Sequence, residues 1–179
     1  MLGRASTAAA AALACASSAL AAAPIPTPIG VGPRFQPGAS SPAVAAGRAI
    51  GRLRCARAAQ VQRAHVELFA QGCVVIVPAG IGVARARACT YPVRTFQPTG
   101  VLEFDAAQRL RLGDFFSIWG RRLTRRHLLT FAGRVRAYVG GRRWRGDVRQ
   151  IPLTRHAQIV LEVGPYIPPH ATFLFGPGR

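Results

Sequence analysis

The chain has 179 residues and a formal net charge of +18, and all 24 of its basic residues are Arg. This length allows one domain with tails. Hydrophobic residues make up 50% of the chain, which is enough for a core and excludes wholesale disorder. Because Asp and Glu together number only six, the folded surface is expected to be strongly basic.

The N-terminus predicts a secretory signal peptide over residues 1–23. A short start containing Arg4 precedes an apolar stretch of small residues, and cleavage after Ala21 fits the small-x-small rule. The stretch is rich in Ala rather than Leu, which makes it a poor permanent membrane helix. A lipid anchor at Cys15 is the less favoured alternative, because Leu13 lies one place from its usual position in a lipidation motif. We therefore expect an extracytoplasmic protein, secreted or associated with the cell envelope.

Composition divides the rest of the chain into three parts. Residues 24–51 hold six Pro among Gly, Ser and Ala, with no hydrophobic period. Because Pro lacks a backbone N–H and fixes φ, this segment is expected to form no ladder and to act as an extended linker. Residues 52–165 carry the strand patterns and form the predicted β-rich domain. Residues 166–179 form a Pro-rich tail that we expect to pack without regular structure.

Strands are predicted at residues 65–70, 73–77, 100–105, 134–139, 142–149 and 158–163. The pairs Gln71-Gly72 and Gly140-Gly141 are typical of tight hairpin turns, so each is expected to join two neighbouring strands. Residues 112–120 predict a short helix, because Asp114 suits its first turn and Gly120 suits the position after its end.

The aromatic residues of this helix are Phe115, Phe116 and Trp119, which are expected to form one face that packs in the core. Strands on both sides of one short central helix predict an α+β domain in which a β-rich mixed sheet packs on that helix. A β-grasp-like order of strand, strand, helix, strand, strand is favoured, and an open β-sandwich is the alternative.

Removal of the signal peptide leaves Cys55, Cys73 and Cys89, and an exported protein is expected to bridge two of them. Cys55 and Cys89 lie in irregular chain on either side of the first hairpin, whereas Cys73 opens a run of Val and Ile that should be buried. We therefore predict a disulfide between Cys55 and Cys89, with Cys73 to Cys89 as the alternative. An enzyme using a Cys73 or Cys89 nucleophile would need a nearby His, and only His65 is near in sequence.

Other chemistry-bearing patterns are scarce. None of the four His is two or four positions from another, and neither a Cys-x-x-Cys pair nor a Gly-rich phosphate loop occurs. No catalytic residue, cofactor or metal site is therefore predicted. The alternative is a degenerate metal site at His65 with Glu67, Glu103 or Asp105, although salt bridges to Arg are the simpler expectation for these acids.

The charge imbalance is the main functional signal, because a basic surface attracts anionic partners over long distances. For an exported protein we expect anionic cell-envelope polymers or lipid headgroups as partners, and no specific nucleic acid. A non-enzymatic binding or structural module is the favoured function, and a solvated basic surface without a dedicated partner is the alternative. The candidate anion-binding residues are Arg121, Arg122, Arg125, Arg126, Arg142, Arg143 and Arg145.

Four sequence blocks resemble an uncharacterised family of extracytoplasmic bacterial domains. They are Val-Pro-Ala-Gly-Ile-Gly-Val (77–83), Cys-Thr-Tyr (89–91), Thr-Gly-Val (99–101) and Leu-Gly-Asp-Phe-Phe-Ser-Ile-Trp-Gly (112–120). The family pattern also contains His residues that suggest a metal cluster. At those places this chain keeps His65 but has Arg63, Arg94, Phe96 and Glu103. Because Arg stays protonated and cannot ligate a metal, the resemblance implies a shared scaffold without that site.

Overall fold

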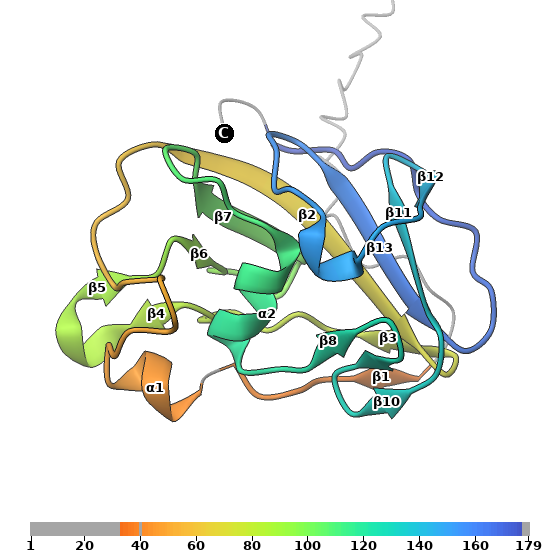
Figure 1. The fold of residues 1–179 in the computed structure, drawn as a ribbon, viewed down its shortest axis with the longest axis horizontal. Helices are drawn as coiled ribbons and strands as arrows, with labels where there is room; N and C mark the ends of the chain where they lie inside the picture. The colour runs from red at the N-terminus through yellow and green to blue at the C-terminus, as the bar shows by residue number, and fades with distance from the viewer. Residues whose placement is uncertain (1–32, 40, 177–179) are drawn as a thin grey trace, which may run out of the picture.

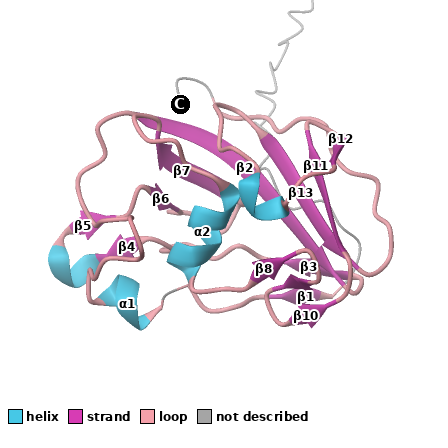
Figure 2. Cartoon of the chain, in the orientation of Figure 1, coloured by secondary structure: helices cyan, strands magenta, loops and turns pink. Residues whose placement is uncertain are grey.

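A computed structural model describes residues 33–39 and 41–176, and its fold is α+β and mostly sheet (Figure 1, Figure 2). The predicted signal peptide, Cys15 and the first part of the predicted linker lie outside the described residues. Among the described residues, no helix has the length and apolarity needed to cross a bilayer.

The strands of the described residues are β1 (Arg34–Phe35), β2 (Val61–Ala70), β3 (Cys73–Val75), β4 (Val83–Ala84), β5 (Cys89–Thr90), β6 (Val93–Arg94), β7 (Val101–Asp105), β8 (Leu123–Thr124), β9 (His127–Leu128), β10 (Phe131–Ala132), β11 (Val135–Val139), β12 (Arg142–Trp144) and β13 (Gln158–Val163). The helices are α1 (Pro42–Ala45) and α2 (Leu112–Trp119), with 3-10 turns η1 (Arg85–Arg87) and η2 (Val148–Gln150).

The long strand β2 organises the main sheet, whose strand order is β1-β3-β2-β13-β11-β12. One edge of β2 pairs in parallel with β13 from His65 to Ala70. Its other edge pairs with β7 along its first half and with β3 along its last residues, both antiparallel. Strand β6 extends the sheet beyond β7. The mixed sheet expected from the sequence is therefore present, and β2 holds three neighbours at once.

The core lies between one face of this sheet and α2 (Figure 1). Phe115, Phe116 and Trp119 are all buried there, with ring centroids 5.5–5.7 Å apart, as the aromatic pattern predicted. The Asp114 carboxylate accepts the backbone N–H of Arg111 at the start of the helix. Gly120 ends the helix in the left-handed region at φ 68°. Both helix signals in the sequence are confirmed.

The prediction that residues 24–51 form no ladder is wrong for the described part of this segment. The N–H groups of Val74 and Ile76 in the β3 region donate to the carbonyls of Pro33 and Phe35 at 3.0 and 2.8 Å. A Pro at a sheet edge can accept such a bond, since its missing N–H is needed only if another strand pairs beyond it. Helix α1 follows, and its Val44 is fully buried in the main core.

The second hairpin also differs from its predicted length. Strand β12 ends at Trp144 rather than continuing to residue 149. The Trp144 indole N–H donates to the Asp147 carbonyl at 3.1 Å, and the Asp147 side chain caps η2 through the N–H of Arg149. These local bonds turn the chain out of the sheet. Strand β13 has the predicted bounds, and residues 166–176 pack without helix or strand, as expected.

The predicted disulfide between Cys55 and Cys89 is confirmed, and Cys73 is free. The bridge ties the segment after α1 to β5, where Ala56 and Thr90 also form a β-bridge. The disulfide therefore anchors the N-terminal segment that covers the core.

Reduction of this disulfide should lower the melting temperature by roughly 10 °C. The bridged residues are 34 positions apart, and closing a loop of that length contributes about 3–4 kcal/mol in the chain-entropy model. Calorimetric melting with and without reductant measures the loss. Cys55→Ser should reproduce it and abolish the reductant effect, whereas Cys73→Ser should melt like the natural protein and stay sensitive to reductant.

Candidate functional site

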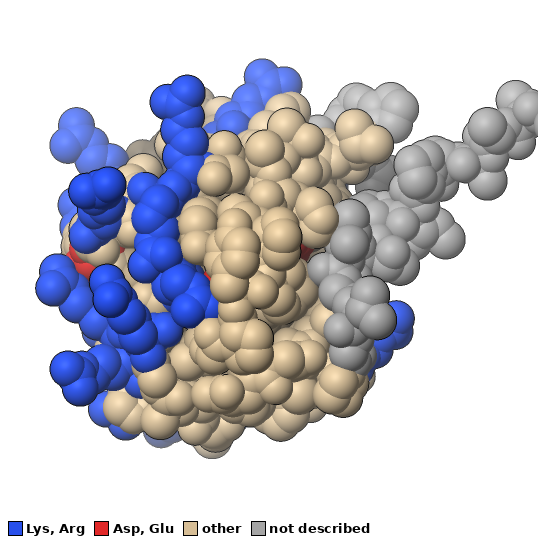
Figure 3. Space-filling model, turned by 90° about the vertical axis from the view of Figure 1, so that its right-hand side faces the viewer, with Lys and Arg blue, Asp and Glu red and all other residues tan. Residues whose placement is uncertain are grey.

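An open cleft of about 1040 Å³ lies between the β8–β9 turn and β12. Five Arg line it: Arg125, Arg126, Arg134, Arg143 and Arg145. The described residues that line the cleft include no Asp or Glu. Figure 3 shows Arg side chains gathered on the left of the face in view, beside a wide central area of uncharged residues. The cleft is thus a concave and strongly basic surface.

Backbone hydrogen bonds hold the walls of the cleft in place. The N–H groups of Gly133 and Val135 donate to the carbonyls of Arg126 and Arg125, both at 2.9 Å. These bonds fix the β8–β9 turn against the start of β11. On the opposite side Trp144 is in register with Ala137 of β11, so the sheet itself fixes the indole that lines the cleft. The arginines therefore extend from a rigid frame.

The cleft arginines lack acidic partners within the described residues. Arg125, Arg126, Arg134 and Arg145 are exposed, and none of them forms an ion pair there. Arg143 differs, because its guanidinium lies over the Tyr138 ring at 5.3 Å and donates to the Tyr138 hydroxyl at 3.2 Å. Four unneutralised guanidinium groups on one concave surface favour binding of an anion.

The predicted anion-binding residues do not all converge. Arg125, Arg126, Arg143 and Arg145 line the cleft, whereas Arg121 and Arg122 line a separate hollow of about 170 Å³ beside α2. Arg142 lines neither of these hollows. Residues missed by the sequence analysis are Arg134, which belongs to the cleft, and Trp144, which lies on its wall. A third hollow of about 500 Å³ is lined by Arg52, Arg109, Arg111 and Arg149 together with Asp114 and Asp147.

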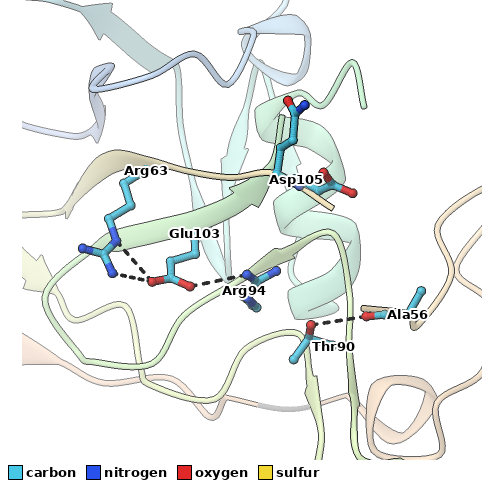
Figure 4. A network of polar contacts seen from close by, with 7 residues as sticks. Ala56, Arg63, Thr90, Arg94, Glu103 and Asp105 are labelled. Atoms are coloured by element: carbon cyan, nitrogen blue, oxygen red, sulfur yellow. Dashed lines mark hydrogen bonds and ion pairs between the residues drawn. The ribbon is translucent and has the colours of Figure 1, made fainter. Parts of the chain in front are cut away.

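Two acids of the main sheet, Glu103 and Glu162, form ion pairs with arginines that do not line the cleft. On the sheet face away from α2, the Glu103 carboxylate accepts from Arg63 at 2.6 Å and from Arg94 at 3.4 Å (Figure 4). The side chain of Arg94 is 6% exposed, and its second terminal nitrogen has no partner in the described residues. Glu103 thus forms salt bridges with Arg, as expected.

Two further buried acids lie on the same sheet. Glu162 is fully buried and accepts from Arg136 at 3.0 Å. Burial raises the pKa of Glu162, against the opposing effect of Arg136. Burial acts in the same direction on Asp105, but hydrogen bonds from Gln60, Ala107 and Gln108 outweigh it and lower the pKa of Asp105.

His65 lies in a polar cluster beneath the C-terminal tail. Its Nε2 is 2.8 Å from the Thr99 carbonyl, and its Nδ1 is 2.7 Å from the Gln158 side chain. The Phe173 ring stacks on the imidazole with centroids 3.6 Å apart. Gly100 leaves room for the imidazole, because a Cβ at position 100 would lie 2.9 Å from His65 Nε2. The histidine is therefore fixed on both nitrogens and on one face.

Burial lowers the pKa of His65, outweighing the hydrogen bonds to Gln158 and Thr99 and the charge of Glu67. The neutral ring must keep its proton on Nε2, because the Thr99 carbonyl can only accept. Nδ1 then accepts, so the Gln158 amide must present its NH₂ group. A half-turn of that amide achieves this and gives the Gln158 nitrogen, otherwise unpartnered and buried, a hydrogen bond.

The residues of the alternative metal site do not converge into one. Glu67 Oε1 lies 3.7 Å from His65 Nδ1, whereas Glu67 Oε2 is within hydrogen-bond distance of His170 Nδ1, at 2.9 Å. In the part of the chain that the structure describes, no group of three or more His, Cys, Asp and Glu is placed to hold a metal ion. Cys89 is in the disulfide, so the proposal of a free Cys89 nucleophile is wrong.

Comparison with known proteins gives no relative from which a function could be inferred. Neither a family model, nor a curated protein, nor a solved structure matches this chain.

Stability should fall as the pH falls below about 6.5, in part through His65. Because the folded pKa lies below the ordinary value of 6.5, the unfolded chain binds the proton first. The contribution of neutral His65 to the free energy of unfolding is thus complete above pH 6.5 and is lost as the pH falls towards the lowered pKa. Melting temperatures across this range should show a flatter pH dependence for His65→Gln.

The matched control is His156→Asn, which removes an exposed histidine that stacks on Phe175 in the same tail. Asn tolerates the positive φ of 58° at this position. The control should keep the full pH dependence of the natural protein. An unchanged slope in His65→Gln would contradict the role given to His65.

Proposed function

We propose that this protein is an exported, non-enzymatic binding or structural module whose arginine-lined cleft holds anionic components of the cell envelope. The observation that carries the proposal is the cleft itself, where exposed arginines face one concave space lined by no described acid. Guanidinium groups form paired, charge-assisted hydrogen bonds with carboxylates and phosphates, so they suit such ligands chemically.

The distribution of acids supports this proposal. All six Asp and Glu lie within the described residues, and each one is engaged. Three form ion pairs with Arg outside the cleft, namely Glu103, Glu162 and Asp114. The others are held by His170 or by N–H groups. No acidic side chain of the described residues forms an ion pair with a cleft arginine, which leaves these guanidinium groups available to solvent ions or to a ligand.

Export is supported by two independent features. The N-terminal sequence has the layout of a signal peptide, and disulfides persist mainly in oxidising compartments outside the cytosol. The Cys55–Cys89 bridge joins the segment after α1 to β5, and its presence supports a location in such a compartment. Envelope polymers and lipid headgroups are the abundant anions that an exported protein meets there.

We also propose that the core is β-grasp-like. The strand order β3-β2-β13-β11-β12, with β2 and β13 parallel at the centre and α2 across one face, supports this assignment. The resemblance to the exported bacterial domains remains part of the proposal. Its support is geometric, since Arg63, Arg94 and Glu103, which replace His in that pattern, converge around one carboxylate (Figure 4).

Loss of the cleft charges should weaken binding to acidic polymer beads at low salt. Replacing three exposed cleft arginines by Gln should lower the affinity about tenfold, from roughly 0.5 kcal/mol per exposed contact. The variant combines Arg125→Gln, Arg126→Gln and Arg145→Gln. Its matched control carries the same net charge and combines Arg57→Gln, Arg85→Gln and Arg155→Gln, three exposed arginines that line none of the three hollows.

The elution salt concentration measures the effect on columns of acidic and of neutral polymer beads. The natural protein and the control should elute late from the acidic beads, and the cleft variant early. Identical elution of the natural protein from acidic and neutral beads would refute the proposed function. Equal losses in both variants would show that net charge acts without the cleft.

A further inference from the structure

Two further basic hollows lie next to the cleft at η2. Val148 of η2 lines the cleft, and the next residue, Arg149, lines both the 170 Å³ and the 500 Å³ hollows. Gly113 at the start of α2 also lines both of the smaller hollows. Turn η2 is therefore the common border of all three. Arginines thus line three neighbouring hollows from β12 past η2 to the N-terminal end of α2, and we call these three hollows together the track.

Arginines recur along the whole track, and its two acids are already engaged. Asp114 pairs with Arg52 at 2.8 Å, and the Asp147 side chain accepts the N–H of Arg149 at 3.0 Å. Within the described residues, Arg109, Arg122 and Arg149 form no ion pair. A ligand with a single charge would satisfy one hollow, whereas a chain of repeated charges would satisfy all three.

Trp144 gives the track an apolar surface among the guanidinium groups. The indole is fixed by its bond to the Asp147 carbonyl and by Gly146, where a Cβ would lie 3.1 Å from the indole nitrogen. A flat aromatic ring beside cations suits a sugar ring that bears an acid, because the ring packs its C–H groups on the indole while the acid reaches Arg. A polymer of bare phosphates would leave this surface unused.

The concave shape also argues against a membrane as the ligand. A bilayer presents a broad and nearly flat layer of headgroups, which meets exposed rim arginines but cannot follow the wall of a cleft of about 1040 Å³. A single polymer chain can enter the cleft and continue past η2.

We propose that the ligand is a linear anionic polysaccharide that lies along this track, with one sugar ring against Trp144 and its acidic groups on successive arginines. This inference rests on the proposed function and names the ligand class of the same site. It predicts that affinity depends on chain length and on the sugar ring, as well as on charge.

Calorimetric titration of the purified protein with defined oligogalacturonates tests the length dependence. Affinity should rise at least about tenfold from the dimer to the octamer, since the longer chain adds contacts beyond the cleft. Equal affinity per site for dimer and octamer would contradict the proposal that one chain contacts all three hollows. Replacing Arg122 and Arg149 by Gln should lower the ratio of octamer affinity to dimer affinity, whereas Arg57→Gln with Arg85→Gln should leave that ratio as in the natural protein.

Trp144→Leu tests the sugar ring, with inorganic polyphosphate of matched charge as the comparison ligand. The variant should bind oligogalacturonate several-fold more weakly and polyphosphate as before, while Trp144→Phe should retain most glycan binding. Trp144 also packs on the core, so melting curves are needed to identify an unfolded variant. If Trp144→Leu does not fold, the comparison of dimer and octamer binding by the natural protein tests the proposal instead.

The outcomes separate this inference from the proposed function. Equal binding of both polymers with no effect of Trp144→Leu would overturn the polysaccharide and leave anion binding intact. Tighter binding to anionic-lipid vesicles or to single-stranded DNA than to oligogalacturonate would also overturn it. Failure of every anion to bind would remove the proposed function itself.

Discussion

The parallel pairing of β2 with β13 is the interaction on which the rest of the structure depends. It places a ten-residue strand at the centre of the sheet, with α2 and the core on one face. The other face of β2 carries Arg63, His65 and Glu67, of which the last two are buried beneath the tail. Polar groups in such a place need partners, because an unpaired buried charge or hydrogen-bonding group is costly. Buried polar groups on this face of the sheet are therefore paired with acids and amides, as His65 is with Gln158 and Glu67 is with His170.

This requirement explains the surface charge as well as the interior. With only six acids in the chain, the pairing of Glu103 and Glu162 with buried or half-buried arginines removes them from the surface. Asp114 and Asp147 are held at the starts of α2 and η2, where they cap backbone N–H groups. The arginines of the cleft are left without internal partners. Because the few acids of the chain serve the interior and the helix starts, the cleft keeps a positive charge that attracts anions.

The sequence predicted those features that depend on neighbouring residues. The Gln71-Gly72 hairpin, the bounds of β13 and the ends of α2 follow from local turn and capping signals, and the disulfide follows from where each Cys lies. The β1 ladder was missed because Pro33 argues against a strand locally, although its carbonyl can still accept at an edge. The cleft was predicted only in part, since composition marks basic residues but cannot show that Arg134 and Trp144 meet the β8–β9 turn.

Arginine side-chain NMR provides the most direct test of this division of charge. The ¹H–¹⁵N signals of the guanidinium Nε groups can be followed while the protein is titrated with pyrophosphate at low salt. The account predicts shifts at Arg125, Arg126, Arg134 and Arg145, with the acid-paired Arg63, Arg94 and Arg136 unchanged. Equal shifts at paired and cleft arginines, or none in the cleft, would contradict it.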